Sequence, residues 1–333
     1  CLFTNTHFRF GRGISFVTTP EIAIEITRSY EFSDYERLPP SEPPPYRAEE
    51  LLGRGIGLLA NRTIKSGETV MGNPPVIVLM QKALDTLERE QRYALLHKAV
   101  GQLPEQTQTQ IRALAKSRGG DEIGDIVQTN SIGQSYGKGV RHLSIVPEAA
   151  RINHDCRPNS FYRFDDKDLT LQVFALRNIE AGEEISFNYA GAEFPRDARH
   201  SYLQAHWGFT CACSLCTASH QAIAASDSRL NEISNIKAQL RNTPPRSTAS
   251  LHEILSLVQK LIELYDEERL IVPKAPYYEI AAYTCSQLGN KTCVQRNAEL
   301  AADHWRVLAG EKSWEVTRML GLGGNPKAHP SWR

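Results

Sequence analysis

The sequence lacks a long apolar run. No stretch approaches the roughly 18 consecutive apolar residues that a membrane-spanning helix needs, so we expect no membrane segment. It also lacks net charge, because 38 basic residues balance 38 acidic ones, which removes the electrostatic driving force of a general nucleic-acid binder. Cysteine is scarce and unevenly spaced, with seven in 333 residues, and this pattern argues against a disulfide scaffold.

The chain also lacks an initial methionine. It begins at Cys1, which indicates that residues have been removed and leaves open a signal or targeting peptide upstream. At this length a single core usually divides, so two domains are expected. Residues 1–38 predict a β-rich segment. Five prolines crowd positions 39–45, and this crowding predicts an extended surface linker over residues 39–52.

From residue 53 onwards, strand and helix patterns alternate. The segment 81–118 has apolar residues at helical spacing, and it contains no cysteine and a single histidine. Short strand patterns precede and follow this helical insert. An internal echo relates residues 62–68 to 177–183, which agree at Arg, Ile, Gly and Glu. Both copies are typical of a tight turn that enters a strand, so two strand systems separated by a helical insert are expected.

Beyond residue 219 the sequence predicts helices to its end. Apolar residues recur on one face of five stretches, and Gly289 and Gly310 are typical C-terminal stops. A stack of helical hairpins over residues 220–333 follows from this pattern. Cys285 and Cys293 are eight residues apart, a spacing without a metal signature, and we expect them to be buried core thiols.

Three cysteines within six residues, Cys211, Cys213 and Cys216, are the strongest metal signal. Their thiolates suit a soft ion with a tetrahedral shell, such as zinc. A cluster of core cysteines or disulfides is the alternative, although thiols this dense would be redox-labile without a metal. The candidates for a fourth ligand are a histidine and the remaining cysteines, Cys1, Cys156, Cys285 and Cys293.

Two further motifs are ambiguous when each is taken alone. Residues 153–159 read Asn-His-Asp-Cys-Arg-Pro-Asn, which fits a metal ligand at His154, a Cys156–His154 nucleophile pair or a satisfied polar turn. Residues 182–189 form an apolar strand that ends at Tyr189. Such a tyrosine is usually a half-buried packing residue, and it gains a chemical role only where it ends in a cleft.

In this order and spacing, the motifs resemble the SET-domain lysine methyltransferases. The resemblance is greatest to the SMYD-like class, without its MYND zinc finger, and to fungal SET-domain proteins. It covers about half of the chain, from residue 53 to 216. The matching segments are 53–57, 130–131, 151–159, 182–189, and 208–209 with the cysteine cluster.

The fold implied by this resemblance is α+β. A SET domain of small sheets would span residues 53–190 and enclose the helical insert 81–118. A post-SET zinc-binding segment would follow at 191–219, and an all-α domain of helical hairpins would occupy 220–333.

The resemblance also implies roles for single residues. Tyr189 would be the catalytic residue beside the transferring methyl group, and it would also contact the cofactor. Cys156 would complete a structural Zn²⁺ site with Cys211, Cys213 and Cys216. The residues that would bind S-adenosylmethionine are Arg54, Gly55, Ile56 and Gly57 through their backbone, Asn130, Asn153, His154 and Phe209.

Two positions depart from the family pattern. Ala150 and Asp155 stand where family members often carry serine, and the missing hydroxyl at Ala150 would weaken one cofactor contact. An earlier Gly-Arg-Gly-Ile run begins at Gly11 and is a decoy for the cofactor loop. We favour the second run, because only that one is followed by the echo at 62–68.

The expected partner is a protein or peptide that carries a lysine, with neither nucleic acid nor membrane bound directly and the chain monomeric. An enzyme acting on a small-molecule amine and a non-catalytic SET-derived binding module are the alternatives. Zinc-bound thiolates suit a reducing compartment, so cytoplasm or nucleus is expected. The missing N-terminus leaves secretion open.

Overall fold

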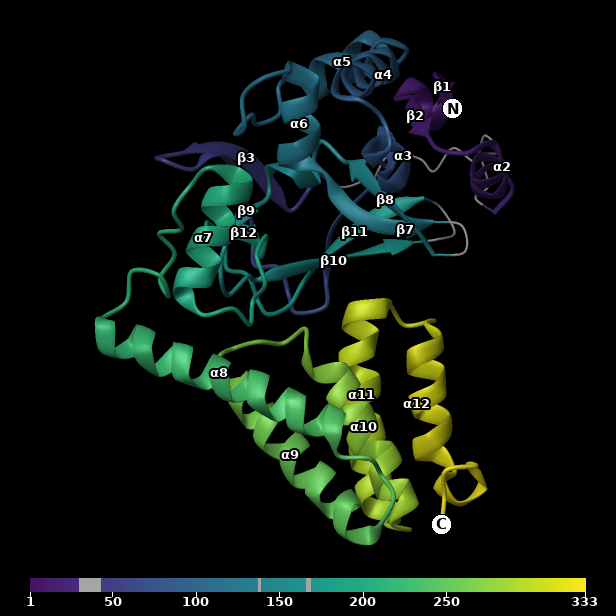
Figure 1. Cartoon of the computed structure of the whole chain (residues 1–333), viewed down its shortest axis with the longest axis vertical. Helices are drawn as coiled ribbons and strands as arrows, with labels where there is room; N and C mark the ends of the chain where they lie inside the picture. Colours follow the sequence, from purple (N-terminus) through teal and green to yellow (C-terminus); the bar gives the residue numbers. More distant parts are fainter. Residues whose placement is uncertain (30–42, 137–138, 166–168) are drawn as a thin grey trace. The chain divides into compact units, whose positions relative to one another are not determined.

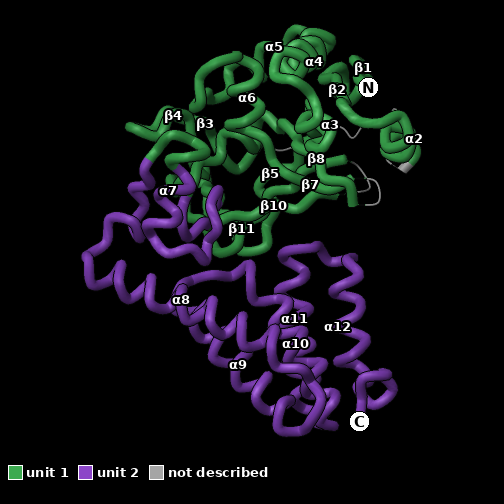
Figure 2. Tube along the Cα trace, viewed as in Figure 1, with its two compact units in different colours: residues 1–154, 159–187, 204–209 green, residues 155–158, 188–203, 210–333 purple. Residues whose placement is uncertain are grey.

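The computed structural model describes residues 1–29, 43–136, 139–165 and 169–333 (Figure 1). These residues divide into two compact units (Figure 2). The first comprises residues 1–154, 159–187 and 204–209, and the second comprises 155–158, 188–203 and 210–333. The motif at 153–159 is therefore shared, because its first two residues and its last belong to the first unit and the four between them to the second.

Three small sheets form the β part of the first unit. The five-stranded sheet has the order β1–β2–β6–β8–β7, from Leu2–Asn5, Ile14–Val17, Ile77–Met80, Val140–Ile145 and Ile132–Tyr136. The three-stranded sheet has the order β10–β11–β5, from Ser160–Asp165, Thr170–Ala175 and Thr69–Asn73. The four-stranded sheet has the order β3–β4–β12–β9, from Tyr46–Leu51, Gly55–Ala60, Glu184–Phe187 and Asn153–His154. Small sheets with a helical insert confirm the predicted α+β class.

The helical insert covers the five-stranded sheet. Leu96, Val100 and Ile111 are buried in one core with Ile77 and Ile145 of the sheet. The apolar faces of the helices and the sheet thus shield each other from water. The helices predicted for 81–118 are confirmed. They are α3 (Gln81–Asp85), α4 (Arg89–Gly101) and α5 (Glu105–Arg112), followed by α6 (Glu122–Asn130).

The two copies of the internal echo pair with each other. Ile64 and Ile179 form an isolated antiparallel bridge, in which each backbone N–H donates to the other carbonyl at 2.9 Å. Gly67 and Gly182 occupy equivalent turn positions with φ of +80° and +84°. The predicted turns are confirmed, and their glycines supply the left-handed backbone that each turn requires.

The N-terminal segment differs from its prediction. Pro20–Ser29 is helix α2, with Ile22 and Ile26 buried on one face at helical spacing, so the expectation of β structure was wrong there. Residues 30–42, which include the start of the expected linker, lie outside the described residues. The end of that linker range forms β3, because its backbone completes a hairpin with β4. The short helices α1 (Phe8–Gly11) and η1 (Ala149–Arg151) complete the first unit.

The C-terminal helices confirm the predicted stack of hairpins. Each helix from α8 to α12 packs against the next one in sequence (Figure 1). Gly289 and Gly310 follow α10 and α11 with φ of +65° and +95°. The helices are α7 (Arg196–Trp207), α8 (His220–Asn242), α9 (Thr248–Glu267), α10 (Lys274–Gln287), α11 (Lys291–Ala309), α12 (Trp314–Gly324) and η2 (Pro326–Ala328). Among the described residues, no helix combines the length and apolar character that crossing a bilayer requires.

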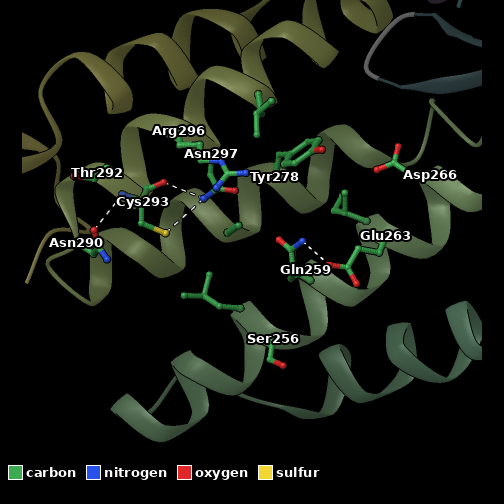
Figure 3. Close-up of a pocket in the computed structure, with 15 residues that line it drawn as sticks. Ser256, Gln259, Glu263, Asp266, Tyr278, Asn290, Thr292, Cys293, Arg296 and Asn297 are labelled. Atoms are coloured by element: carbon green, nitrogen blue, oxygen red, sulfur yellow. Dashed lines mark hydrogen bonds between the residues drawn. The ribbon is translucent and has the colours of Figure 1, made fainter.

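A cavity of about 710 Å³ lies among α9, α10 and α11 (Figure 3). Val258, Ile262 and Ala281 provide apolar lining, whereas Glu263 and Arg296 contribute charged side chains. The cavity thus combines an apolar wall with polar groups of both signs.

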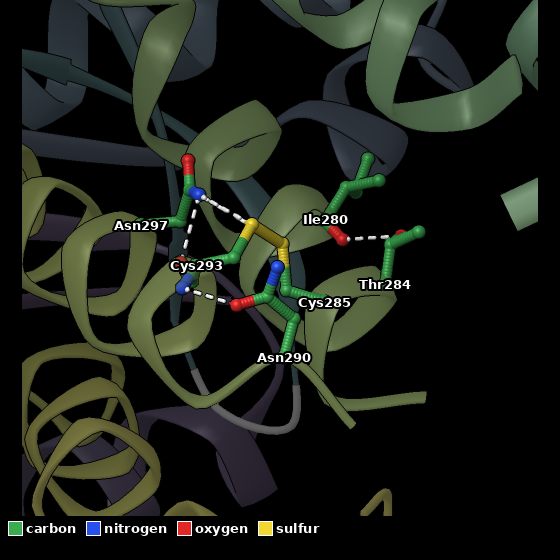
Figure 4. Close-up of a disulfide and its surroundings, with 6 residues drawn as sticks. All are labelled: Ile280, Thr284, Cys285, Asn290, Cys293 and Asn297. Carbon is green, nitrogen blue, oxygen red and sulfur yellow. Dashed lines mark hydrogen bonds between the residues drawn. A yellow bond between two sulfur atoms is a disulfide. The ribbon is translucent and has the colours of Figure 1, made fainter. Parts of the chain in front are cut away.

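One wall of this cavity contains half of a disulfide. Cys293 on α11 is bonded to Cys285 on α10, with Cα atoms 5.6 Å apart (Figure 4). The expectation that both would be free core thiols was wrong. Adjacent antiparallel helices joined by a short turn bring residues eight positions apart face to face, a proximity that the linear spacing did not show. The side chain of Asn297 donates to the Cys293 carbonyl at 2.9 Å.

Candidate functional site

The glycine-rich segment after residue 52 forms a tight hairpin. β3 and β4 pair antiparallel with Leu51 opposite Gly55, and the backbone N–H of Arg54 donates to the Leu51 carbonyl at 2.9 Å. Gly53 and Gly55 have φ of +71° and +68°, in the left-handed region that residues with a Cβ rarely adopt. The turn therefore requires both glycines, and it places Arg54 between them.

A single carboxylate, on Glu184 of β12, holds two of the predicted cofactor residues. Arg54 Nε lies 3.1 Å from Glu184 Oε2, and the amide of Asn153 donates to Glu184 Oε1 at 2.9 Å. A second nitrogen of Arg54 donates to the backbone carbonyl of His154 at 3.0 Å. The side chains of Arg54 and Glu184 are 31% and 21% exposed, so this network remains accessible to a ligand.

Gly57 packs directly against this network. A Cβ at this position would come within 2.9 Å of both Asn153 Nδ2 and Glu184 Oε1, and within 2.5 Å of the Leu51 side chain. Any side chain here would push the network apart. The space that a Cβ would fill at Gly57 is taken by the protein's own atoms, and the predicted contact of its backbone with the cofactor stays a prediction.

Strand pairing fixes the segment that carries Asn153. β9 pairs in parallel with β12, so that Asn153 lies opposite Ser186. Asn159, at the end of the same motif, is buried and binds the same strand. Its amide donates to the Glu184 carbonyl at 2.8 Å, and its oxygen accepts from the Ser186 N–H at 2.9 Å. Two asparagines of one motif therefore brace β12.

His154 and Phe209, both predicted to bind the cofactor, lie close together. Their ring centroids are 6.0 Å apart, with the ring planes inclined by 55°. Gly208 precedes Phe209 with φ of +73°. The indole N–H of Trp207 donates to the Thr129 carbonyl at 2.9 Å and anchors the segment. The structure thus brings Arg54, Gly57, Asn153, His154 and Phe209 into the first unit.

Asn130 belongs to the end of α6. Its side-chain nitrogen donates to the carbonyls of Ala115 at 2.8 Å and Ile126 at 2.7 Å. Both amide hydrogens are consequently used within the fold. A contact between this residue and a ligand would have to involve its amide oxygen or its backbone.

Tyr189 is partly buried and belongs to the second unit. The neighbouring Asn188 donates to the carbonyls of Asp155 at 3.2 Å and Cys156 at 3.4 Å. The carboxylate of Asp155 accepts from the Arg157 N–H at 2.8 Å. Aspartate therefore closes the turn where serine is frequent, and Asn188 ties this turn to the segment of Tyr189.

The four predicted metal ligands come together in the second unit. The sulfurs of Cys156, Cys211, Cys213 and Cys216 all lie within 4.8 Å of one another, and all four residues are buried and take no part in a disulfide. The Sγ of Cys156 is 3.9 Å from that of Cys211 and 3.5 Å from that of Cys216. A tetrahedral zinc with Zn–S bonds of about 2.3 Å separates its sulfurs by about 3.8 Å. The donor set and its spacing fit zinc.

A buried cation lies against these sulfurs. Arg199 on α7 is 1% exposed, and its guanidinium donates to Cys216 Sγ at 3.9 Å. Burial lowers the pKa of Arg199, but the sulfurs of Cys156 and Cys216 outweigh burial and raise it overall. A zinc ion with four thiolates carries two net negative charges, and the buried guanidinium offsets one of them.

The neighbouring thiols shift one another's pKa values in opposite directions. Hydrogen bonding with the Cys156 thiol is the largest influence on Cys216, and it lowers the pKa of Cys216 to about 6. Hydrogen bonds with the neighbouring thiols, first that of Cys211, raise the pKa of Cys156. The thiols therefore compete for negative charge, and a bound cation would allow all four to ionise.

Comparison with a family model assigns one region of the chain to a known domain. Residues 55–190 match the SET domain family model. This part of the chain is a SET domain. It includes Glu184 and Asn153, both copies of the echo, and the strand that leads to Tyr189, and Arg54 directly precedes it.

Relatives of known name match different shares of the chain. It is 26% identical over 252 residues to "Histone-lysine N-methyltransferase set5" of Schizosaccharomyces pombe, covering 70% of this chain and 73% of that protein. It is 25% identical over 146 residues to "N-lysine methyltransferase SMYD2" of Gallus gallus, covering 44% and 30%. It is 34% identical over 89 residues to "Histone-lysine N-methyltransferase ATXR2" of Arabidopsis thaliana, covering 26% and 19%. The chain thus spans most of the set5 protein but less than a third of the other two.

Two residues of these sites were missed at the sequence level. Glu184 was noted only as part of the strand that ends at Tyr189, although a carboxylate entering that strand was the available signal. Arg199 lies in a polar helix whose sequence offers no signal, because only the fold brings it to Cys216.

Proposed function

We propose that this SET protein transfers a methyl group from S-adenosylmethionine to a lysine amine of a protein substrate. The observation that carries the proposal is the network of Arg54, Glu184 and Asn153, which joins three motifs around one carboxylate within the SET region. Two relatives, set5 and SMYD2, align with more residues of this chain than the SET match does, and both are named lysine methyltransferases.

The chain's own residues would hold the cofactor. S-adenosylmethionine, when bound, supplies an activated methyl group on a positively charged sulfur. Glu184 orients the amide of Asn153, and Arg54 fixes the His154 carbonyl, so both groups are set before a ligand arrives. The ring of Phe209 would contribute an apolar surface beside His154.

Tyr189 would act on the lysine amine. A free lysine has a pKa of about 10.4 and must lose its proton before it can attack. Burial in an apolar channel lowers that pKa, because it disfavours the charged form. The hydroxyl of Tyr189 would orient the neutral amine in line with the methyl group, and water would carry the proton away. This role requires no dedicated general base.

The four cysteines would hold a structural zinc. Four thiolates close the tetrahedral shell and leave no position for a reactive water. The ion would join the turn that carries Cys156 to the segment 211–216. Zinc-bound thiolates suit the cytoplasm or the nucleus, where most thiols stay reduced, whereas a disulfide such as Cys285–Cys293 is rare there.

Calorimetric titration with S-adenosylmethionine tests the cofactor site. We expect one-to-one binding by the zinc-containing chain, and binding at least about 10-fold weaker in Asn153→Ala, since the amide held by Glu184 is lost. Asn231→Ala, on an exposed helix face, is the matched control and should bind like the parent protein. Absence of binding by folded, zinc-containing protein would refute the methyltransferase proposal.

Methyl transfer is tested with labelled S-adenosylmethionine and core histones, because two relatives are named histone-lysine methyltransferases. Tyr189→Phe should lower kcat about 100-fold while cofactor affinity changes little, since a positioning hydroxyl acts mainly in the transition state. Labelling of small amines but of no protein would instead favour the small-molecule reaction. Binding without any transfer would favour a non-catalytic module.

A further inference from the structure

A carboxylate buried among the C-terminal helices reaches the metal-binding turn. Glu268 directly follows α9, and its side chain is only 2% exposed. The adjacent Glu267 has a side chain that is 60% exposed. These two consecutive glutamates therefore differ in exposure, and the burial of the charged Glu268 needs an explanation.

Glu268 is fully engaged by groups from two different segments. Its Oε2 accepts from the Ser226 hydroxyl at 2.8 Å, and its Oε1 accepts from Arg229 Nε at 2.6 Å, both from α8. Arg157 donates to Oε2 from outside the helical stack. Burial raises the pKa of Glu268, but the hydrogen bonds from Arg157 and Ser226 outweigh burial and lower it overall. The carboxylate is thus held in its charged form.

Arg157 connects this carboxylate to the metal-binding turn. It immediately follows Cys156, and its side chain is 12% exposed. A second guanidinium nitrogen donates to the Cys156 carbonyl at 2.8 Å and to the Ala192 carbonyl at 3.1 Å. One rigid planar group therefore binds Glu268, the backbone of Cys156 and the segment after Tyr189 at once.

We infer that Glu268 is a positioning residue for the zinc site, acting through Arg157 to hold the Cys156 thiolate in place. The inference rests on the zinc site of the proposed function. It gives the C-terminal helices a task besides their own packing, because the carboxylate that secures the turn lies at the end of α9. Outer-shell partners that orient metal ligands commonly contribute about 10- to 100-fold to metal affinity.

The test is the rate at which the full chain releases zinc to a metallochromic chelator. Glu268→Gln should release zinc about 10-fold faster than the parent protein, since it removes the charge that holds Arg157. Glu267→Gln is the matched control, one residue away and exposed, and its rate should not change. Arg229→Met should lower stability without changing zinc release, because Arg229 contacts Glu268 from within the helical stack.

Arg157→Gln keeps the test valid if Glu268→Gln fails to fold. It should also release zinc about 10-fold faster, and the double variant should release it no faster than either single variant, because both act through one contact. A rate equal to the parent's in both single variants would overturn the inference. So would faster release in Arg229→Met, which would reveal a general loosening of the helices.

Methyl transfer, measured separately, distinguishes the two proposals. Transfer by the parent protein together with an unchanged zinc rate in Glu268→Gln would keep the enzyme and overturn the positioning role. Faster zinc release in that variant, from a chain that transfers no methyl group, would support the positioning role and refute the enzyme. A folded chain that holds no zinc would overturn the positioning role outright.

Discussion

Two arginine–glutamate pairs hold the two parts of one seven-residue motif, and they do so in different environments. In the first unit, Arg54 and Glu184 secure Asn153 and are 31% and 21% exposed. In the second unit, Arg157 and Glu268 secure the turn of Cys156 and are 12% and 2% exposed. We call Arg54–Glu184 the open pair, because its exposure lets a ligand reach it. We call Arg157–Glu268 the buried pair, because solvent and ligands do not reach its carboxylate.

Replacing the glutamate of each pair by alanine should give the largest difference between the pairs, measured as the loss in the free energy of unfolding. Glu268→Ala leaves two arginines facing a site without a carboxylate, and we expect a loss of about 3–5 kcal/mol in the free energy of unfolding. Glu184→Ala should cost about 1 kcal/mol or less, because solvent screens a partly exposed pair. Urea unfolding of both variants measures this contrast. Equal losses would show that exposure does not separate the two pairs.

Gly57→Ala should disturb the open pair without touching the buried one. The new methyl group would lie 2.9 Å from Asn153 Nδ2 and from Glu184 Oε1, so the network must open. We expect cofactor affinity to fall about 10-fold and stability to fall by about 1–3 kcal/mol, as for other overpacked sites. Calorimetry and urea unfolding check both effects. Gly101→Ala, where a Cβ meets no atom within 4 Å, should alter neither stability nor affinity in this way.

Lowering the pH should gradually remove the contribution of the buried pair to stability. We expect this to be the smallest effect of the series. The pKa of Glu268 is lowered in the fold, so its contribution is complete above the unfolded value of about 4.3 and is lost as pH falls through the folded pKa. The stability difference between the parent protein and Glu268→Gln should hold from pH 7 to about 5 and shrink below about 4.3. A difference that stays constant to pH 3 would contradict this. Glu267→Gln provides the reference curve.

The sequence predicted local features of both units well. Helices α8 to α12 follow from apolar spacing and glycine stops, since both signals depend on residues a few positions apart. The turns at Gly67 and Gly182 were equally readable from their repeated pattern. The prediction for Pro20–Ser29 was wrong because the β-prone run over residues 14–19 outweighed the helical spacing of Ile22 and Ile26 in the interpretation.

Long-range partners were less predictable. The clustering of Cys156 with three cysteines some 55 to 60 positions away came from a family resemblance, and the spacing alone left other ligands open. Nothing local to Glu268 distinguishes it from Glu267, because burial is decided by how α8 and α9 pack. The disulfide was missed because the short turn between α10 and α11, rather than a motif, brings its sulfurs together.

The bridge between Ile64 and Ile179 has a consequence for synthesis of the chain. Ile179 follows Ile64 by 115 residues, and a ribosome adding about 5–20 residues per second needs roughly 6–23 s to cover that distance. During this interval β4 and β5 have left the ribosome without their partners β12 and β11. The helices of the insert are made in the same interval. The nascent SET domain must therefore keep two unpaired strand edges from aggregating until its last strand is made.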